Sequence, residues 1–233
     1  MQAVVVEREI GGRKLSIETG KIAKQASGAV IVRYGETTIL ATVVTSKPRP
    51  GIDFFPMTVD YREKIYAAGK FPGGFFKREG RPTTKEILTA RMIDRPIRPL
   101  FPEAFRDEVL IQIMVLSTDQ QNDPDIPSIA GASAALCIAG VPFNGPIAAV
   151  RVGRVDDKLV VNPTESQIEF SDLEMIVAGH SEAVNMIEVG AVELPEDLIA
   201  EAIETGQESV VTICEMIKEL KEKCGKPVSW EAP

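Results

Sequence analysis

The stretch with the most distinct chemistry is segment 70–82, which reads KFPGGFFKREGRP. Its Pro-Gly-Gly turn predicts a loop, so the adjacent rings of Phe75 and Phe76 are expected outside any strand. Lys77 and Arg78 follow the rings directly. Bases that stack on aromatic rings gain about 1–3 kcal/mol each, and neighbouring cations neutralise phosphates. The pattern predicts a contact for single-stranded nucleic acid. The alternative is a buried aromatic pair under a charged, solvated rim.

Three arginines follow on the next helical run. Arg91, Arg95 and Arg98 are spaced i, i+4 and i+7, which places them on one face if the helix is continuous. A guanidinium group binds phosphate oxygens in a bidentate manner, so such a row would contact an RNA backbone or free phosphate. The alternative is ion pairing at a surface or between subunits, with residues such as Asp94 and Glu103.

The sequence gives weaker support for a metal site or a catalytic nucleophile. Asp172 and Glu174 stand two apart before an apolar stretch, and they share a face if a strand begins there. Paired carboxylates can hold Mg²⁺, but an ordinary turn is the alternative. His180 is the only histidine, which argues against a histidine metal site or a Ser-His-Asp triad. No phosphate-binding glycine motif has the required spacing. From the residues alone, the carboxylate pair stays open as a weak candidate for a metal site.

The charge of the chain is unevenly distributed. The net charge of −8 over 233 residues argues against a general nucleic-acid coat. Residues 60–106, however, carry 11 Lys and Arg against 6 Asp and Glu, whereas residues 107–233 carry 7 against 23. A basic region on an acidic body is typical of directed binding to an anionic chain.

The composition predicts a globular, cytoplasmic protein. Hydrophobic residues make up 44% of the chain, enough for a sizeable core. No apolar run approaches the roughly 18 residues of a membrane span, and the first residues lack the order of a signal peptide. Cys137, Cys214 and Cys224 are odd in number and lack ligand spacing, so reduced thiols are expected.

The order of the predicted elements indicates an α+β fold with a mixed sheet packed by helices. The first helix is expected to stop at Pro96 and Pro99. The second is built from Ser, Ala and Gly, which predicts close packing, and Gly206 is expected to weaken or bend the third. The predicted helices span 84–95, 127–139 and 195–224. The predicted strands span 3–9, 14–19, 28–34, 37–46, 54–62, 109–116, 147–155, 158–161, 174–178 and 185–192.

Several long motifs resemble the first core domain of the bacterial polynucleotide phosphorylase family. They are FFKREGRPTTKEILTARMIDRPIRPLFP (75–102), QQNDPDIPSIAGAS (120–133), EMIVAGH (174–180) and GKIAKQASG (20–28). The resemblance covers essentially all 233 residues and implies one RNase PH-like domain over 1–233, within a longer multidomain chain. In the family, two such domains are joined by a helical domain and followed by KH and OB-type RNA-binding modules.

The same resemblance implies a function. The family forms trimeric rings that degrade single-stranded RNA from the 3′ end with inorganic phosphate, reversibly releasing nucleoside diphosphates, and it takes part in RNA-degradation assemblies. Residues 75–78 would line the RNA channel. The family often has Phe-Phe-Arg-Arg here, so Lys77 keeps the charge of an arginine but lacks its planar guanidinium group. Arg91, Arg95 and Arg98 match positions of active-centre arginines.

The catalytic pattern is where this chain departs from the family. The phosphate-binding serines and Mg²⁺-binding aspartates belong to the family's second domain, whereas this chain has the run 128–133 and the Asp172–Glu174 pair at the equivalent places. The resemblance therefore implies a domain that guides RNA, with chemistry and Mg²⁺ housed elsewhere. Two alternatives stay open: an independent small phosphorolytic exonuclease, and a structural ring subunit without RNA contact.

Overall fold

Two β-sheets form the frame of the molecule, whose computed structural model describes residues 3–231. The first sheet has the strand order β1-β2-β3-β4-β6-β5 and the second β10-β9-β7-β8. The first-sheet strands are β1 (Val4–Ile10), β2 (Arg13–Thr19), β3 (Gly28–Tyr34), β4 (Thr37–Ser46), β5 (Met57–Glu63) and β6 (Glu108–Ser117). Those of the second are β7 (Ala148–Val155), β8 (Lys158–Val161), β9 (Leu173–Gly179) and β10 (Val184–Ala191).

The first sheet is mixed and the second is antiparallel. Strand β5 pairs in parallel with β6 at one edge, while the other neighbours in the first sheet are antiparallel. The α+β class and the mixed sheet predicted from the sequence are thus confirmed, but the strands divide between two sheets where one was expected. The 3-10 turn η1 (Ile65–Ala68) follows β5, so segment 69–82 leaves the sheet from its edge strand.

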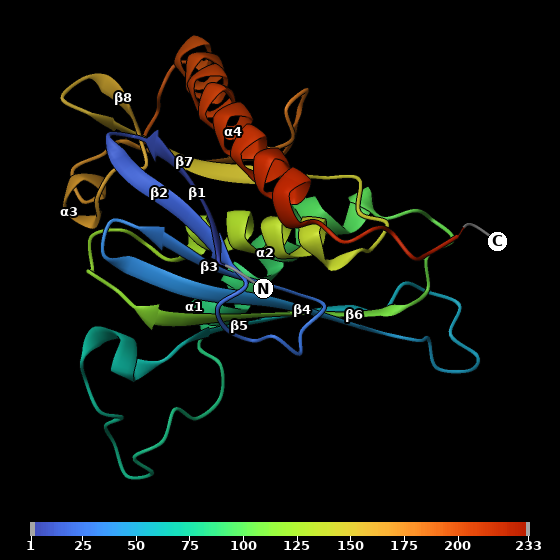
Figure 1. The fold of residues 1–233 in the computed structure, drawn as a ribbon. Helices are drawn as coiled ribbons and strands as arrows, with labels where there is room; N and C mark the ends of the chain where they lie inside the picture. The colour runs from blue at the N-terminus through green and yellow to red at the C-terminus, as the bar shows by residue number, and fades with distance from the viewer. Residues whose placement is uncertain (1–2, 232–233) are drawn as a thin grey trace.

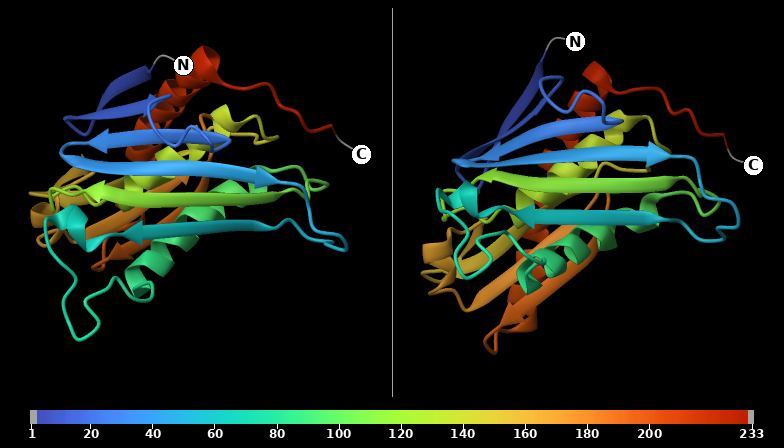
Figure 2. Two further views of the ribbon diagram at one scale, coloured as in Figure 1. Left: turned by 60° about the horizontal axis from the view of Figure 1, so that its bottom comes forward. Right: turned by 90° about the horizontal axis from the view of Figure 1, so that it is seen from below.

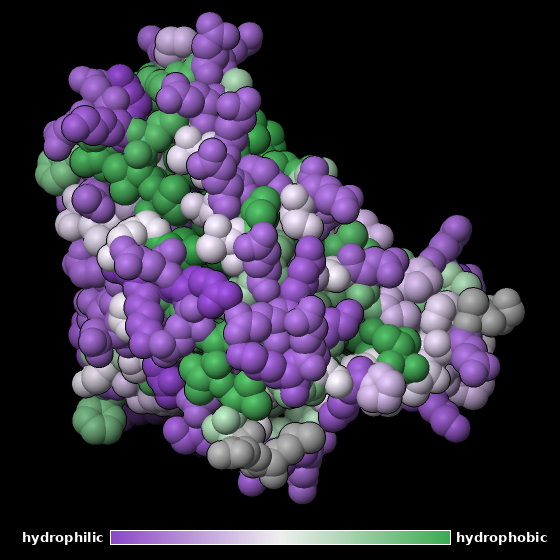
Figure 3. Space-filling view, turned by 45° about the horizontal axis from the view of Figure 1, so that its top comes forward, coloured by the Kyte–Doolittle hydropathy of each residue, from purple (hydrophilic) through white to green (hydrophobic). Residues whose placement is uncertain are grey.

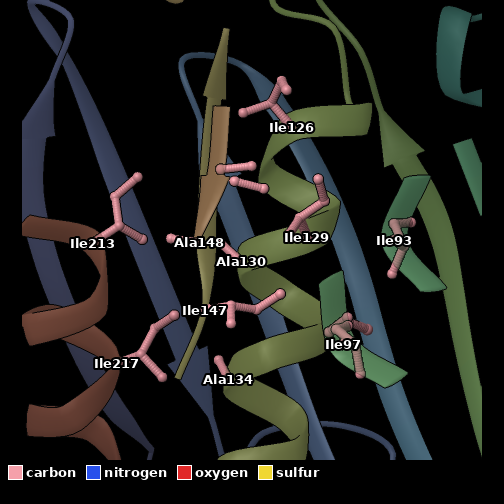
Figure 4. Close-up of a cluster of buried hydrophobic side chains, with 14 of the residues drawn as sticks. Ile93, Ile97, Ile126, Ile129, Ala130, Ala134, Ile147, Ala148, Ile213 and Ile217 are labelled. Carbon is pink, nitrogen blue, oxygen red and sulfur yellow. The ribbon is translucent and has the colours of Figure 1, made fainter. Parts of the chain in front are cut away.

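Helix α2 (Asp125–Ala139) lies between the two sheets (Figure 1). Of its fifteen residues, only the last is not buried. A β carbon on Gly131 would stand 2.9 Å from Ile39 Cδ1, so the helix approaches β4 as closely as its small residues allow. This confirms the close packing that its composition predicts. Figure 4 shows Ile129 and Ala130 of α2 close to Ile147, the residue before β7.

Helices α1 (Thr84–Ile97) and α4 (Glu196–Cys224) complete the core from two sides, and α3 (Glu165–Ile168) is a short turn of helix. Ile93 and Ile97 of α1, and Ile213 and Ile217 of α4, are buried and point into the same cluster (Figure 4). Two further views show α4 on the side of the molecule away from the segment after η1 (Figure 2).

Packing decides two positions in the helices, Pro96 and Gly206, that the sequence treats by local rules. Pro96 does not stop α1, which continues to Ile97 and passes into the 3-10 turn η2 (Arg98–Leu100). Proline removes one backbone donor, but here it is buried near the helix end, where that loss matters less than its packing. Gly206 lies inside an unbroken α4, where a β carbon would stand 2.9 Å from Val177 Cγ2. It therefore serves close packing on β9.

Within residues 3–231, no helix is long and apolar enough to cross a membrane.

Replacing Gly28 tests how tightly β3 and α2 are joined. A β carbon at this position would stand 2.1 Å from the carbonyl oxygen of Ala135, and backbone cannot move as a side chain can. We expect Gly28→Ala to lower the free energy of unfolding by about 2–3 kcal/mol. The matched variant Gly73→Ala, whose β carbon meets nothing within 4 Å, should stay within about 0.5 kcal/mol of the parent.

Urea unfolding measures both variants. The signal is the fluorescence of Trp230, the only tryptophan, whose ring packs edge-on against Phe105 with 5.6 Å between centroids. Equal stability of the two glycine variants would contradict the close approach of β3 to α2.

Candidate functional site

Segment 69–82 is an exposed loop fixed at both ends. At its start, the amide of Lys70 donates to the carbonyl of Ile65. Near its end, the Glu79 carboxylate accepts from the amide of Ile65 at 3.1 and 3.3 Å. Thr83 and Glu86 then form a capping box that starts α1. These contacts hold the base of the loop while its middle projects from the sheet edge (Figure 1).

The aromatic rings of this loop lie outside the core. Phe75 is 95% exposed, Phe76 is 83% exposed, and Phe71 on the same loop is 94% exposed. The rings of Phe75 and Phe76 meet edge to face, with centroids 5.5 Å apart. Large apolar side chains rarely stay this exposed without a partner, and here three occur within six residues. Sequence reasoning singled out the adjacent pair but not Phe71.

Cations surround these rings. Lys70, Lys77, Arg78 and Arg81 are all exposed, and none forms an ion pair within the described residues 3–231. Lys77 adopts a positive φ of 48°, which turns the backbone sharply next to the ring pair. The one acidic residue of the loop, Glu79, is held by the amide of Ile65. The loop therefore presents aromatic faces and unpaired positive charge together.

The three arginines of the α1 region have different environments. Arg91 is exposed and lines a cleft of about 370 Å³ between α1 and β5. Arg95 is exposed and pairs with Glu188 of β10. Arg98 binds the Asp94 carboxylate through Nε at 2.9 Å and Nη2 at 2.6 Å, and it also donates to the carbonyl of Met57. The donors of Arg98 thus serve the fold, and Arg91 is the member of the row with the most freedom.

The carboxylate pair does not form a metal site. Asp172 binds Arg154 at 2.5 Å and precedes β9, while Glu174 lies 3.5 Å from Nε of Arg151. Each carboxylate already faces a guanidinium group, so the pair does not fit Mg²⁺. Among residues 3–231, no cluster of three His, Cys, Asp or Glu side chains is arranged to hold a metal ion.

The serines of α2 are buried structural groups. Ser128 donates to the carbonyl of Pro124 at 2.5 Å, and Ser133 accepts from the amide of Ile147 at 2.9 Å. Both side chains are fully buried, so neither is available to a phosphate group.

An ionic cluster with a buried pair at its centre lies at the N-terminus of α2, and sequence reasoning missed it. Arg151 of β7 binds Asp125 of α2 at 2.5 Å and reaches toward Asp123 at 3.8 Å. Lys85 of α1 binds Asp123 at 3.1 Å and Glu63 of β5 at 3.2 Å. The cluster thereby joins α1, α2 and strands from both sheets. Its members are scattered over nearly ninety positions, so no local pattern reveals it.

Ionisable side chains in and near this cluster have shifted pKa values. Burial raises the pKa of Asp125, and the charge of Arg151 opposes this rise. Burial also raises the pKa of Tyr61, whose hydroxyl donates to Glu63 at 2.7 Å. Asp119, in the turn before α2, shows the reverse: its burial is outweighed by hydrogen bonds, chiefly from Asn122, which lower its pKa to about 2. These shifts have structural causes, because paired charges and backbone donors account for them.

Truncating Arg151 tests whether the cluster supports the fold. Arg151→Met leaves Asp125 buried without its cation, and breaking a buried pair costs about 3–5 kcal/mol of unfolding free energy. Adding Asp125→Asn should recover part of this loss, because the orphaned charge is removed. The control Arg8→Met breaks an exposed pair with Glu219 and should cost at most about 1 kcal/mol. Urea unfolding of all three variants checks this, and equal costs for Arg151→Met and Arg8→Met would contradict it.

Comparisons with known proteins agree with this architecture. The model of domain 1 of the 3′ exoribonuclease family, RNase PH, matches residues 11–142, and that of domain 2 matches residues 145–209. The crystal structure of Rrp46 from rice (Oryza sativa) superposes with a TM-score of 0.70 at 13% identity, covering 95% of this chain and 94% of that one. This likeness confirms the RNase PH-like fold.

Curated relatives share much more sequence. Polyribonucleotide nucleotidyltransferase of Desulfatibacillum aliphaticivorans is 57% identical over 226 residues, and that of Heliobacterium modesticaldum is 55% identical over 224. Each match covers 96% of this chain and 32% of the relative, so the chain spans about a third of the length of these relatives. Together, the family models and these relatives confirm the resemblance seen in the sequence: the chain belongs to the 3′ exoribonuclease family.

Proposed function

We propose that this chain is the RNA-guiding first core domain of a phosphate-dependent 3′-to-5′ exoribonuclease. In this proposal residues 1–233 act as one RNase PH-like unit. Phe75 and Phe76 stack bases, while Lys77 and Arg78 neutralise phosphates. The exposure of the two rings beside unpaired cations is the observation that carries the proposal. The two relatives described above, both polyribonucleotide nucleotidyltransferases, supply the reaction class.

The distribution of charge favours the same surface. The loop leaves the edge of the first sheet, and acidic helix α4 covers the opposite side of the molecule (Figure 1). A negatively charged strand is attracted to the loop and repelled by α4. Of the arginines near α1, Arg91 is the best placed to add a phosphate contact, since Arg95 and Arg98 already bind carboxylates.

The proposal extends to the complete enzyme. It uses inorganic phosphate as co-substrate and releases nucleoside diphosphates, and its Mg²⁺ is held outside this chain, because Asp172 and Glu174 face arginines. It works in the cytoplasm as a homotrimer around an RNA channel, in contact with other RNA-degrading proteins. The chain's own residues bind the strand and orient it.

Mutations of the aromatic rings and of the cations in the loop should change RNA binding in two different ways. Phe75→Ala and Phe76→Ala remove stacking, so each should weaken single-stranded RNA binding by up to about 1–3 kcal/mol with little change in salt dependence. Lys77→Ala and Arg78→Ala remove phosphate contacts, so each should flatten the slope of log affinity against log salt by about 0.7. Fluorescence anisotropy with oligonucleotides of different sequence measures both effects, and stacking should be insensitive to the base.

The control for this series is Lys158→Ala, an exposed lysine on β8, which should change neither affinity nor slope. If none of the four loop variants alters RNA binding while Lys158→Ala also has no effect, the chain is a structural ring subunit without RNA contact.

The ion pairs of Asp172 and Glu174 with arginines lead to a prediction for the activity of the isolated chain. With Mg²⁺, inorganic phosphate and single-stranded RNA, it should release no nucleoside diphosphate, because the carboxylates are engaged and Ser128 and Ser133 are buried. Chromatography of the products checks this. Robust release that Asp172→Ala abolishes would instead support an independent small exonuclease.

A further inference from the structure

A second cleft, remote from the aromatic loop, opens between the connection 20–28 and the C-terminal end of α4. Its volume is about 500 Å³, within the range of roughly 300–1,000 Å³ typical of small-molecule sites. Part of its lining is apolar, which gives a planar ring a surface to pack against. This apolar part, here called the floor, includes Val4, Ile22, Ala26, Ala29 and Ile138.

The rim of this cleft is cationic. Lys24, Lys223 and Lys226 line it, and no Asp or Glu is among the described residues that do so. Lys226 Nζ reaches across to the carbonyl oxygen of Ser27 at 2.6 Å. Lys223 is paired with Glu219 at 2.5 Å, which leaves Lys24 and Lys226 as the cations without a carboxylate within residues 3–231.

This concentration of positive charge is unusual for its setting. The chain carries a net charge of −8, and the exposed side of α4 is predominantly acidic. In the space-filling view, hydrophilic side chains cover much of the face around α4, with hydrophobic atoms visible between them (Figure 3). A lysine in the last turn of a helix offsets the helix dipole, which accounts for Lys223. It does not account for Lys24, which comes from a different segment.

We propose that this cleft binds a nucleoside phosphate. The base would lie on the apolar floor, and the phosphate oxygens would lie between the ammonium groups of Lys24 and Lys226. Two lysines that no carboxylate neutralises favour an anion such as phosphate, and the apolar floor adds contact area for a base that an anion alone would not use. The site does not rest on the proposed RNA-guiding role, since no residue of segment 69–82 lines it.

Cys224 offers a direct readout, because it lines the cleft and is only half-buried. Cys137 and Cys214 are buried, and burial raises the pKa of each to about 12, so they react slowly. We would use ADP as the probe and measure the rate of Cys224 alkylation by iodoacetamide. Saturating ADP should slow alkylation at least about fivefold, while adenosine at the same concentration should protect far less, because it lacks the phosphates.

Substitutions test whether protection by ADP depends on Lys24 and Lys226. Lys24→Ala and Lys226→Ala should each raise the ADP concentration needed for half-protection by about fivefold to tenfold. Lys158→Ala, on the exposed strand β8, should leave it unchanged. Phe75→Ala should also leave it unchanged, which separates this site from the RNA contact of the loop.

Further probes distinguish the source of the ligand. If a short 5′-phosphorylated RNA protects Cys224 at a lower concentration than ADP does, the result supports the site with an RNA terminus as its ligand. If ADP protects at the lower concentration, the result supports a free nucleotide as the ligand. Equal protection by inorganic phosphate and ADP would overturn the proposal, because the floor would then contribute nothing. Absence of protection by both ADP and RNA would also overturn it.

Discussion

The ion pair between Arg151 and Asp125 is the interaction on which the arrangement of the molecule most depends. It joins β7 of the second sheet to the first turn of α2, the helix that both sheets share, and it is almost fully buried. Through Asp123 and Lys85 the same cluster extends to α1 and β5. Charges removed from water are stable only when they are paired, so β7 and α2 must meet in one geometry. The more exposed pairs of Lys85 link this buried pair to the end of β5 and the start of α1. The aromatic loop runs between those two points, and its own hydrogen bonds fix its base.

That fixed base explains how the loop can expose its rings. Three phenylalanines in solvent are unfavourable for the isolated chain, and the loop keeps them there because Glu79, the capping box of α1 and the amide of Lys70 restrict its ends. Only the middle of the loop is left without such restraints. The proposed function uses this arrangement, because a rigid support with an adaptable tip suits a contact that accepts any base.

The sequence predicted the elements well where the pattern was local. The strands predicted over 28–34 and 37–46, the small residues of α2 and the helix predicted over 195–224 all correspond to observed elements. It failed where tertiary packing decides, as at Pro96 and Gly206, and it did not foresee that the strands divide between two sheets. The exposed pair Phe75–Phe76 was visible because adjacent aromatics after a glycine turn form a local signal. The ionic cluster was not, because Glu63, Lys85, Asp125 and Arg151 meet only in the folded chain.

The central claim is that single-stranded RNA meets this chain at the aromatic–basic loop and avoids acidic α4. Ultraviolet crosslinking of the chain to a uridine-rich single-stranded RNA, with the crosslinked peptides identified by mass spectrometry, tests it most directly. The claim predicts crosslinks concentrated at Phe75 and Phe76, which are lost when excess unlabelled RNA competes. Crosslinks spread along residues 196–222 of α4, or absent from segment 69–82 while other parts of the chain react, would contradict it.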